Sequence, residues 1–328
     1  MMNSCRFFQI MMLPGEFQPE GGPELALTKK QFRLSPPLEV GCCAFVFEGN
    51  SPCAIGGWRQ LAATCFHRGE VAVNVACSTL CFNRLPLDRA LKTMEELAFS
   101  KVDATISPNS PHMTPADVAA DPARCARLLR YTSSVAPAAL NVEFEPNLDH
   151  ETFLTQFEAI CKLARNLGVA TLTMPAAPAN SKFEAEVARL TELVNLVAPY
   201  GLVLTVETRI GTLTEMPDTA VKLCEKVPGL GLTLDPSHYI CGPNQNKTYD
   251  QVYPYVRHVH LRDTGLSPDK MQVRVGQGEI EYSRIITLLE KHHYDRVLTV
   301  EIMDKPDNPF PMETEVRKLK YLLESLAA

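Results

Sequence analysis

Short apolar runs alternate with amphipathic stretches from residue 71 onward, with a repeat of about 30 residues. A repeat of this length is typical of a β-strand followed by a helix. Most of the apolar runs are short, β-branched and continuously apolar, which favours strands buried on both faces of a parallel sheet. They predict eight strands, at residues 71–78, 102–107, 139–144, 170–174, 202–207, 230–235, 256–261 and 297–302.

The stretches between these runs predict helices. Over residues 151–167 apolar side chains recur every three or four positions, as expected for a helix that rests on a sheet, and Gly168 follows at the place of a C-cap glycine. The other helices are predicted at residues 87–99, 183–198, 218–226, 282–292 and 311–327. Eight strands that alternate with helices predict an α/β fold, a single (β/α)8 TIM barrel over residues 71–328, and such barrels take about 250 residues.

Residues 1–70 do not follow this pattern. Glycine- and proline-rich breaks at residues 21–23, 35–37 and 56–57 interrupt them, and no periodic stretch lasts two helical turns. We therefore predict an irregular, poorly ordered N-terminal extension, with a lid or an oligomerisation arm as the alternative. The apolar run at residues 7–13 follows a single arginine and lacks a small-residue cleavage site, so we expect no signal peptide.

Charge and cysteine content narrow the classes of partner. The formal net charge of -6 provides no positive field for a phosphate backbone, so we expect no nucleic-acid partner. The 11 cysteines are odd in number, scattered and without a CxxC pair, which favours a reduced, cytoplasmic protein in which Cys77 and Cys81 are buried apolar residues. No apolar run reaches the roughly 18 residues of a membrane span. Homo-oligomerisation is left open.

Ionisable residues follow apolar residues at the ends of the last four predicted strands. In TIM barrels the functional groups lie at the C-terminal ends of the strands, and a charge placed directly after buried residues is costly unless something pairs with it. One divalent metal ion would account for all four, because three carboxylates and one imidazole suit Mn²⁺, Co²⁺, Mg²⁺ or Zn²⁺ without choosing among them. The candidate metal ligands are Glu207, Asp235, His260 and Glu301.

Four motifs around these residues resemble the sugar phosphate isomerase/epimerase family, within the xylose isomerase-like TIM barrel superfamily. They are VETR (206–209), LDPSH (234–238), HVHLRD (258–263) and VEIMD (300–304), with the glycine loop VGQGEI (275–280) after the seventh strand. The resemblance covers about residues 71–328 and is strong over residues 202–304. It implies that the four candidate ligands form the metal quartet, that His238 contacts substrate, and that Glu207 and Glu301 are the catalytic pair that moves a proton.

Several neighbours of the quartet have two interpretations. Arg262 and Arg209 either bind a polar or anionic part of the substrate or serve as charge partners of the carboxylates. Asp263 is a candidate acceptor for the ligand histidine. His258 lies two residues before that histidine on the same strand face and deeper in the barrel, which favours a hydrogen-bonded core histidine. Backbone amides of the Gly276-x-Gly278 loop are suited to receive an anion.

The first half of the barrel departs from the family. Many relatives carry a glutamate late in the second strand and a histidine at the end of the third, where this sequence has Ile106 or Ser107 and Phe144 or Glu145. Of the polar residues nearby, Glu143 is the candidate substrate-binding residue. The other contacts considered are Asn109, His112 and Glu145.

These features predict a metal-dependent isomerase or epimerase. It would act on a small-molecule carbohydrate, namely a sugar, ketose or related polyol, by removing a proton next to a carbonyl, with the metal stabilising the enediolate. A metal-dependent dehydratase of the inosose or dehydroshikimate type and a noncatalytic sugar-binding barrel are the alternatives. A role in DNA repair is disfavoured, because the extra histidines and acids of a trinuclear zinc site are missing in register.

Overall fold

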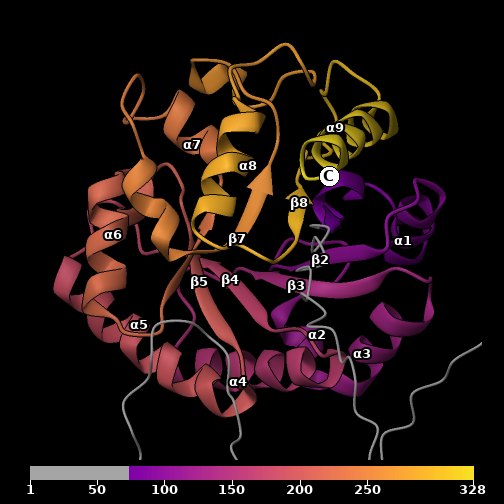
Figure 1. Ribbon diagram of the computed structural model, residues 1–328. Coiled ribbons are helices and arrows are strands. Elements are labelled where there is room, and N and C mark those ends of the chain that lie inside the picture. Colours follow the sequence, from indigo (N-terminus) through magenta and orange to yellow (C-terminus); the bar gives the residue numbers. More distant parts are fainter. Residues whose placement is uncertain (1–73) are drawn as a thin grey trace, which may run out of the picture. The chain divides into compact units, whose positions relative to one another are not determined.

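The computed structural model describes residues 74–328. Within them eight parallel strands form a closed barrel in chain order, in which each strand pairs with the next and the last pairs with the first (Figure 1). The strands are β1 (Val75–Ser78), β2 (Lys101–Ile106), β3 (Ala136–Val142), β4 (Thr171–Pro175), β5 (Val203–Glu207), β6 (Gly231–Leu234), β7 (Val256–Leu261) and β8 (Leu298–Val300). The predicted (β/α)8 barrel is confirmed, whereas the predicted extension over residues 1–70 lies outside the described residues.

Helices surround the barrel (Figure 1). They are α1 (Leu87–Glu96), α2 (Pro115–Ala120), α3 (Pro122–Tyr131), α4 (His150–Leu167), α5 (Phe183–Val197), α6 (Pro217–Lys226), α7 (Pro236–Cys241), α8 (Tyr282–Lys291) and α9 (Met312–Leu326). The six helices expected from periodicity all form, and Gly168 caps α4 in the left-handed conformation with φ 73°. The sequence pattern did not predict α2, α3 and α7. Two of these, α2 and α7, have 6 residues each, too few for a periodic pattern.

Strand register determines which side chains enter the barrel. The hydroxyls of Thr173, Thr205 and Thr233, on β4, β5 and β6, hydrogen-bond to one another at 2.7–3.0 Å inside it. Because side chains alternate along a strand, the residues two positions later also point inward, one step nearer the C-terminal end. Glu207 and Asp235 occupy those positions. The same alternation turns leucines such as Leu204, which is fully buried, towards the helices.

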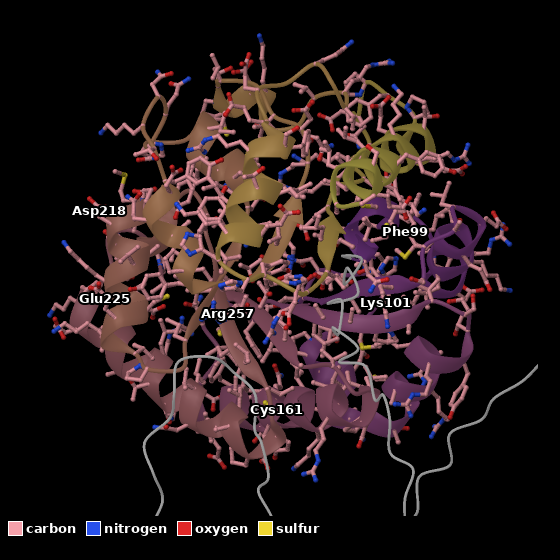
Figure 2. All side chains as sticks on the ribbon, viewed as in Figure 1. Phe99, Lys101, Cys161, Asp218, Glu225 and Arg257 are labelled. Atoms are coloured by element: carbon pink, nitrogen blue, oxygen red, sulfur yellow. The ribbon has the colours of Figure 1, made fainter. Side chains whose placement is uncertain are left out.

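The periphery is polar and the interior is packed. Asp218 and Glu225 on α6 are exposed, and Figure 2 shows them at the outer edge of the molecule, outside the barrel. The six cysteines of the described chain are buried and free, and Cys77 and Cys81 are fully buried, as predicted. Among residues 74–328 no helix combines the length and apolarity needed to cross a membrane.

Candidate active site

Three of the four candidate metal ligands meet at the C-terminal end of the barrel. Glu207 ends β5, His260 lies one residue before the end of β7, and Glu301 follows β8. The Nδ1 atom of His260 lies 3.0 Å from Oε1 of Glu207 and 3.5 Å from Oε1 of Glu301. One ligand atom from each residue lies within 4.8 Å of the others, and all three residues are buried. We call Glu207, His260 and Glu301 the ligand cluster.

The fourth candidate, Asp235, has other partners. It caps the N-terminus of α7, and its Oδ1 accepts hydrogen bonds from the backbone N–H of Ser237 at 3.0 Å and from the Ser237 hydroxyl at 2.5 Å. Its Oδ2 pairs with the guanidinium of Arg262 and lies 3.7 Å from Nε2 of His238. Both oxygens of Asp235 are therefore engaged outside the ligand cluster.

The ligand cluster fits a divalent metal ion. Two carboxylates and one imidazole are a donor set that such ions accept, and three protein ligands leave positions open for substrate oxygens. Oε2 of Glu301 is buried and has no hydrogen-bond partner among the described residues. An unpaired buried carboxylate oxygen is costly, and a bound cation would remove that cost.

Asp103 on β2 joins the cluster from across the barrel and was not among the predicted site residues. Its Oδ2 lies 3.0 Å from Nε2 of His260 and 2.6 Å from Nε2 of His258, and the residue is fully buried. A carboxylate at Nε2 favours a proton on that nitrogen, so Nδ1, which faces the two glutamates, is the nitrogen that would give up its proton to bind an ion. The available signal in the sequence was a charged residue in the middle of an apolar strand.

The structure gives Asp263 a different role from the one expected. Its Oδ2 accepts hydrogen bonds from the backbone N–H groups of Gly276 at 2.7 Å and Gly278 at 3.1 Å. Asp103, not Asp263, is thus the acceptor for the candidate ligand His260, and the anion received by the glycine loop is a side chain of the protein itself. His258 is buried and also lies 3.3 Å from the Thr299 hydroxyl, as predicted for a hydrogen-bonded core histidine.

Gly278 fits its position because it lacks a side chain. A Cβ added there would lie 2.1 Å from Oδ1 of Asp263 and 2.5 Å from the carbonyl oxygen of Thr264. We expect Gly278→Ala to lower the free energy of unfolding by about 1–3 kcal/mol, measured by denaturant titration, because the loop must move off Asp263. Gln277→Ala, at an exposed neighbour in the same loop, is the control and should change it by less than about 0.5 kcal/mol. Equal stabilities of the two variants would contradict the clash.

Residues 94–322 match the model of the family described as xylose isomerase-like TIM barrel. The chain belongs to this family. Among curated protein sequences none matches it significantly.

Several solved structures of low sequence identity have a similar fold. The chain is similar to a D-allulose 3-epimerase from Methylomonas sp. (13% identity, 78% of this chain and 98% of that chain, TM-score 0.61). A xylose isomerase-like TIM barrel protein from Mycobacterium smegmatis in complex with magnesium is also similar (17% identity, 78% of this chain and 98% of that chain, TM-score 0.61). A probable 3-DHS dehydratase, AsbF from Bacillus anthracis, is similar as well (14% identity, 76% of this chain and 98% of that chain, TM-score 0.60). At these identities the likeness shows the fold alone.

Burial and charge set the two glutamates of this xylose isomerase-like barrel apart. Burial alone would raise the pKa of Glu207, but the hydrogen bond and charge of His260 outweigh it and hold that pKa below its usual range. Burial raises the pKa of Glu301, and the negative charge of Glu207 adds to the rise against the opposing charge of His260. The pair therefore combines a carboxylate that stays ionised with a carboxyl group that holds a proton more readily.

The predicted substrate-binding residues lie at two depths. Arg209 and Glu143 pair with each other at the rim, where their side chains are 33% and 40% exposed, and Arg209 lies 3.8 Å from Oε2 of Glu207. His238 is buried, which lowers its pKa, and its Nδ1 accepts the backbone N–H of Ile210 at 3.2 Å. Arg262 is buried against Asp235, so the structure favours its role as a charge partner.

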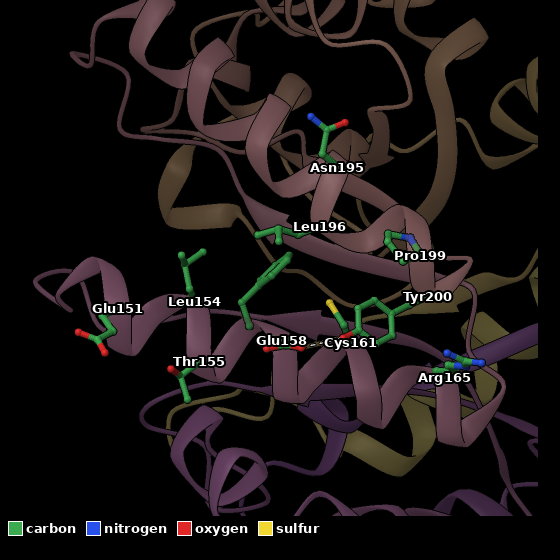
Figure 3. Close-up of a pocket in the computed structure, with 11 residues that line it drawn as sticks. Glu151, Leu154, Thr155, Glu158, Cys161, Arg165, Asn195, Leu196, Pro199 and Tyr200 are labelled. Atoms are coloured by element: carbon green, nitrogen blue, oxygen red, sulfur yellow. Dashed lines mark hydrogen bonds between the residues drawn. The ribbon is translucent and has the colours of Figure 1, made fainter.

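The other candidate contacts of the first half of the barrel lie at its surface. Asn109 and Glu145 are exposed, and Nε2 of His112 lies 2.8 Å from the carbonyl oxygen of Leu85. A cavity of about 590 Å³ lies elsewhere, between α4 and α5 on the outside of the barrel (Figure 3). There the Tyr200 hydroxyl donates to Glu158 at 3.0 Å, and burial raises the pKa of the Cys161 thiol to about 12. A protonated thiol and a tyrosine hydrogen-bonded to a glutamate offer no reactive pair, so we take the ligand cluster as the candidate active site.

Proposed function

We propose that the protein is a divalent-metal-dependent isomerase or epimerase of a sugar, ketose or related polyol. The observation that carries the proposal is the placement of His260 Nδ1 between Glu207 and Glu301, in a buried cluster at the C-terminal end of the barrel. Membership of the xylose isomerase-like family and similarity to a D-allulose 3-epimerase support a carbohydrate substrate.

The ligand cluster would hold the ion. Glu207 and Glu301 would each supply a carboxylate oxygen and His260 its Nδ1, with Asp103 fixing the ring from the other side. When bound, the ion would stabilise negative charge on the substrate oxygens as a proton leaves the neighbouring carbon. Mn²⁺, Co²⁺, Mg²⁺ and Zn²⁺ all suit this donor set, and a magnesium complex of a similar barrel supports a divalent cation.

The two glutamates divide the proton transfer. Glu207, with its lowered pKa, is ionised and suited to remove a proton from carbon, whereas Glu301, with its raised pKa, is suited to return one. Their burial excludes bulk water, which would otherwise screen the charges. One carboxylate takes a proton from carbon and the other returns a different one, so no redox cofactor is needed. The two groups regain their starting protonation by exchange with solvent between turnovers.

Residues nearer the solvent would orient the substrate. Arg209 presents a half-exposed cation at the rim, suited to a hydroxyl, carboxylate or phosphate, and its partner Glu143 can accept a hydrogen bond from a hydroxyl. His238 remains neutral at physiological pH, because burial lowers its pKa, and can bond a hydroxyl without adding charge. We further propose that the protein acts in the cytoplasm, which agrees with the free cysteines of the described chain.

Hydrogen exchange with solvent tests the proposed reaction. Purified protein is first analysed for bound metal and then incubated in D₂O with a panel of ketoses and inososes. We expect deuterium at a carbon next to a carbonyl, detected by NMR, and loss of this signal after chelation. Release of water from the substrate would instead favour the dehydratase. Tight binding of a sugar without exchange or turnover would favour the noncatalytic alternative.

A further inference from the structure

Arg262 places a positive charge inside the candidate metal centre. It is among the largest fully buried side chains of the described chain. Its guanidinium pairs with Oδ2 of Asp235, donates to the Ser237 hydroxyl at 3.0 Å and lies 4.0 Å from Oε1 of Glu301. An arginine does not lose its proton in proteins, so this charge is permanent.

The contacts of Asp235 set its two possible roles against each other. Each of its oxygens already has a strong partner, Ser237 on Oδ1 and Arg262 on Oδ2. To ligate an ion, Asp235 would have to leave a buried, charge-assisted pair or share an oxygen with it, and in either case the ion would lie beside the guanidinium. Two cations close together repel each other strongly where water is excluded.

We propose that Arg262 is a built-in counter-ion that competes with the metal ion for Asp235. The inference rests on the proposed function, because it takes the ligand cluster as the place where the ion binds. With Arg262 on Asp235 an ion would have the three residues of the ligand cluster as its protein ligands, and Asp235 would become a fourth when the guanidinium withdraws. Arg262 thereby lowers the affinity for metal and neutralises buried carboxylates when no metal is bound.

Arg209 provides a matched control. It is also an arginine near the ligand cluster, 3.8 Å from Oε2 of Glu207, but it pairs with Glu143 and makes no contact with Asp235 in the structure. Replacing either arginine with methionine removes one positive charge and keeps an unbranched side chain. A general effect of charge would therefore appear in both variants, and competition for Asp235 in only one.

The experiment is a calorimetric titration of chelator-treated protein with Mn²⁺. Arg262→Met should bind Mn²⁺ at least about tenfold more tightly than the wild type, and Arg209→Met within about threefold of it. Without metal, Arg262→Met should also unfold at a lower temperature than Arg209→Met, because buried carboxylates lose their counter-ion. Unchanged or weaker Mn²⁺ binding by a folded Arg262→Met would overturn the inference.

A second variant tests the competition for Asp235 even if Arg262→Met does not fold. In the wild-type background Asp235→Asn should change the affinity for Mn²⁺ by less than about threefold, because Asp235 is held by Arg262. A loss of tenfold or more, of the order of 10–100-fold, would show that Asp235 is a free ligand and overturn the inference while the proposed function stands. Absence of Mn²⁺ binding in the wild type and both arginine variants would overturn both this inference and the proposed function. Binding of Mn²⁺ by Arg262→Met alone would support the competition for Asp235.

Discussion

Glu301→Gln is expected to lower kcat by about 10²–10⁴-fold while the protein stays folded. Glutamine has nearly the same shape as glutamate but cannot carry the transferred proton. The position is sensitive because Glu301 is buried, lies 3.5 Å from His260 Nδ1 through Oε1, and leaves Oε2 without a partner in the described chain. Burial and the neighbouring Glu207 raise the pKa of Glu301 in the metal-free protein.

The measurement is kcat on whichever ketose exchanges deuterium, together with metal content and far-ultraviolet circular dichroism. Glu279→Gln, at an exposed glutamate within the glycine loop, is the control and should keep the wild-type kcat. Glu207→Gln should lose activity as Glu301→Gln does. Full activity of a metal-loaded Glu301→Gln variant would remove Glu301 from the proton transfer.

The sequence predicted the site residues that lie at the ends of strands. Glu207, His260 and Glu301 each lie at or directly after an apolar run, and parallel strands in a barrel bring such ends to one face. Alternation along the strand then turns them inward. Length, period and end position are local properties, so one sequence suffices to predict three residues that meet within 4.8 Å.

Contacts across the barrel were not predictable in the same way. Asp103 and His260 are 157 positions apart, and local sequence does not indicate which inward side chain faces which across the interior. The same limit applies to Asp235. Its place at the end of β6 was predicted, but its choice of Arg262 as partner depends on side-chain packing between β6 and β7. The sequence therefore left Arg262 either as a substrate contact or as a charge partner of the carboxylates.

Asp103 is expected to control metal affinity by orienting His260. Asp103→Asn is expected to weaken Mn²⁺ binding by about 10–100-fold, measured by the same calorimetric titration. In the wild type the Asp103 carboxylate lies 3.0 Å from His260 Nε2 and favours the tautomer that leaves Nδ1 free to bind the ion. A neutral amide loses this preference, and if its NH₂ group turns to Nε2, the proton moves to Nδ1 and blocks the ligand position.

A variant at His258 distinguishes the orienting role of Asp103 from a general effect on the stability of the fold. Asp103 also lies 2.6 Å from His258 Nε2, so Asp103→Asn should lower the thermal unfolding temperature as well. His258→Ala removes that second contact but leaves the pair of Asp103 and His260 in place. It should therefore reduce stability while keeping Mn²⁺ affinity within about threefold of the wild type. If His258→Ala weakens Mn²⁺ binding as much as Asp103→Asn does, Asp103 acts through the packing of the barrel interior and not through the orientation of His260.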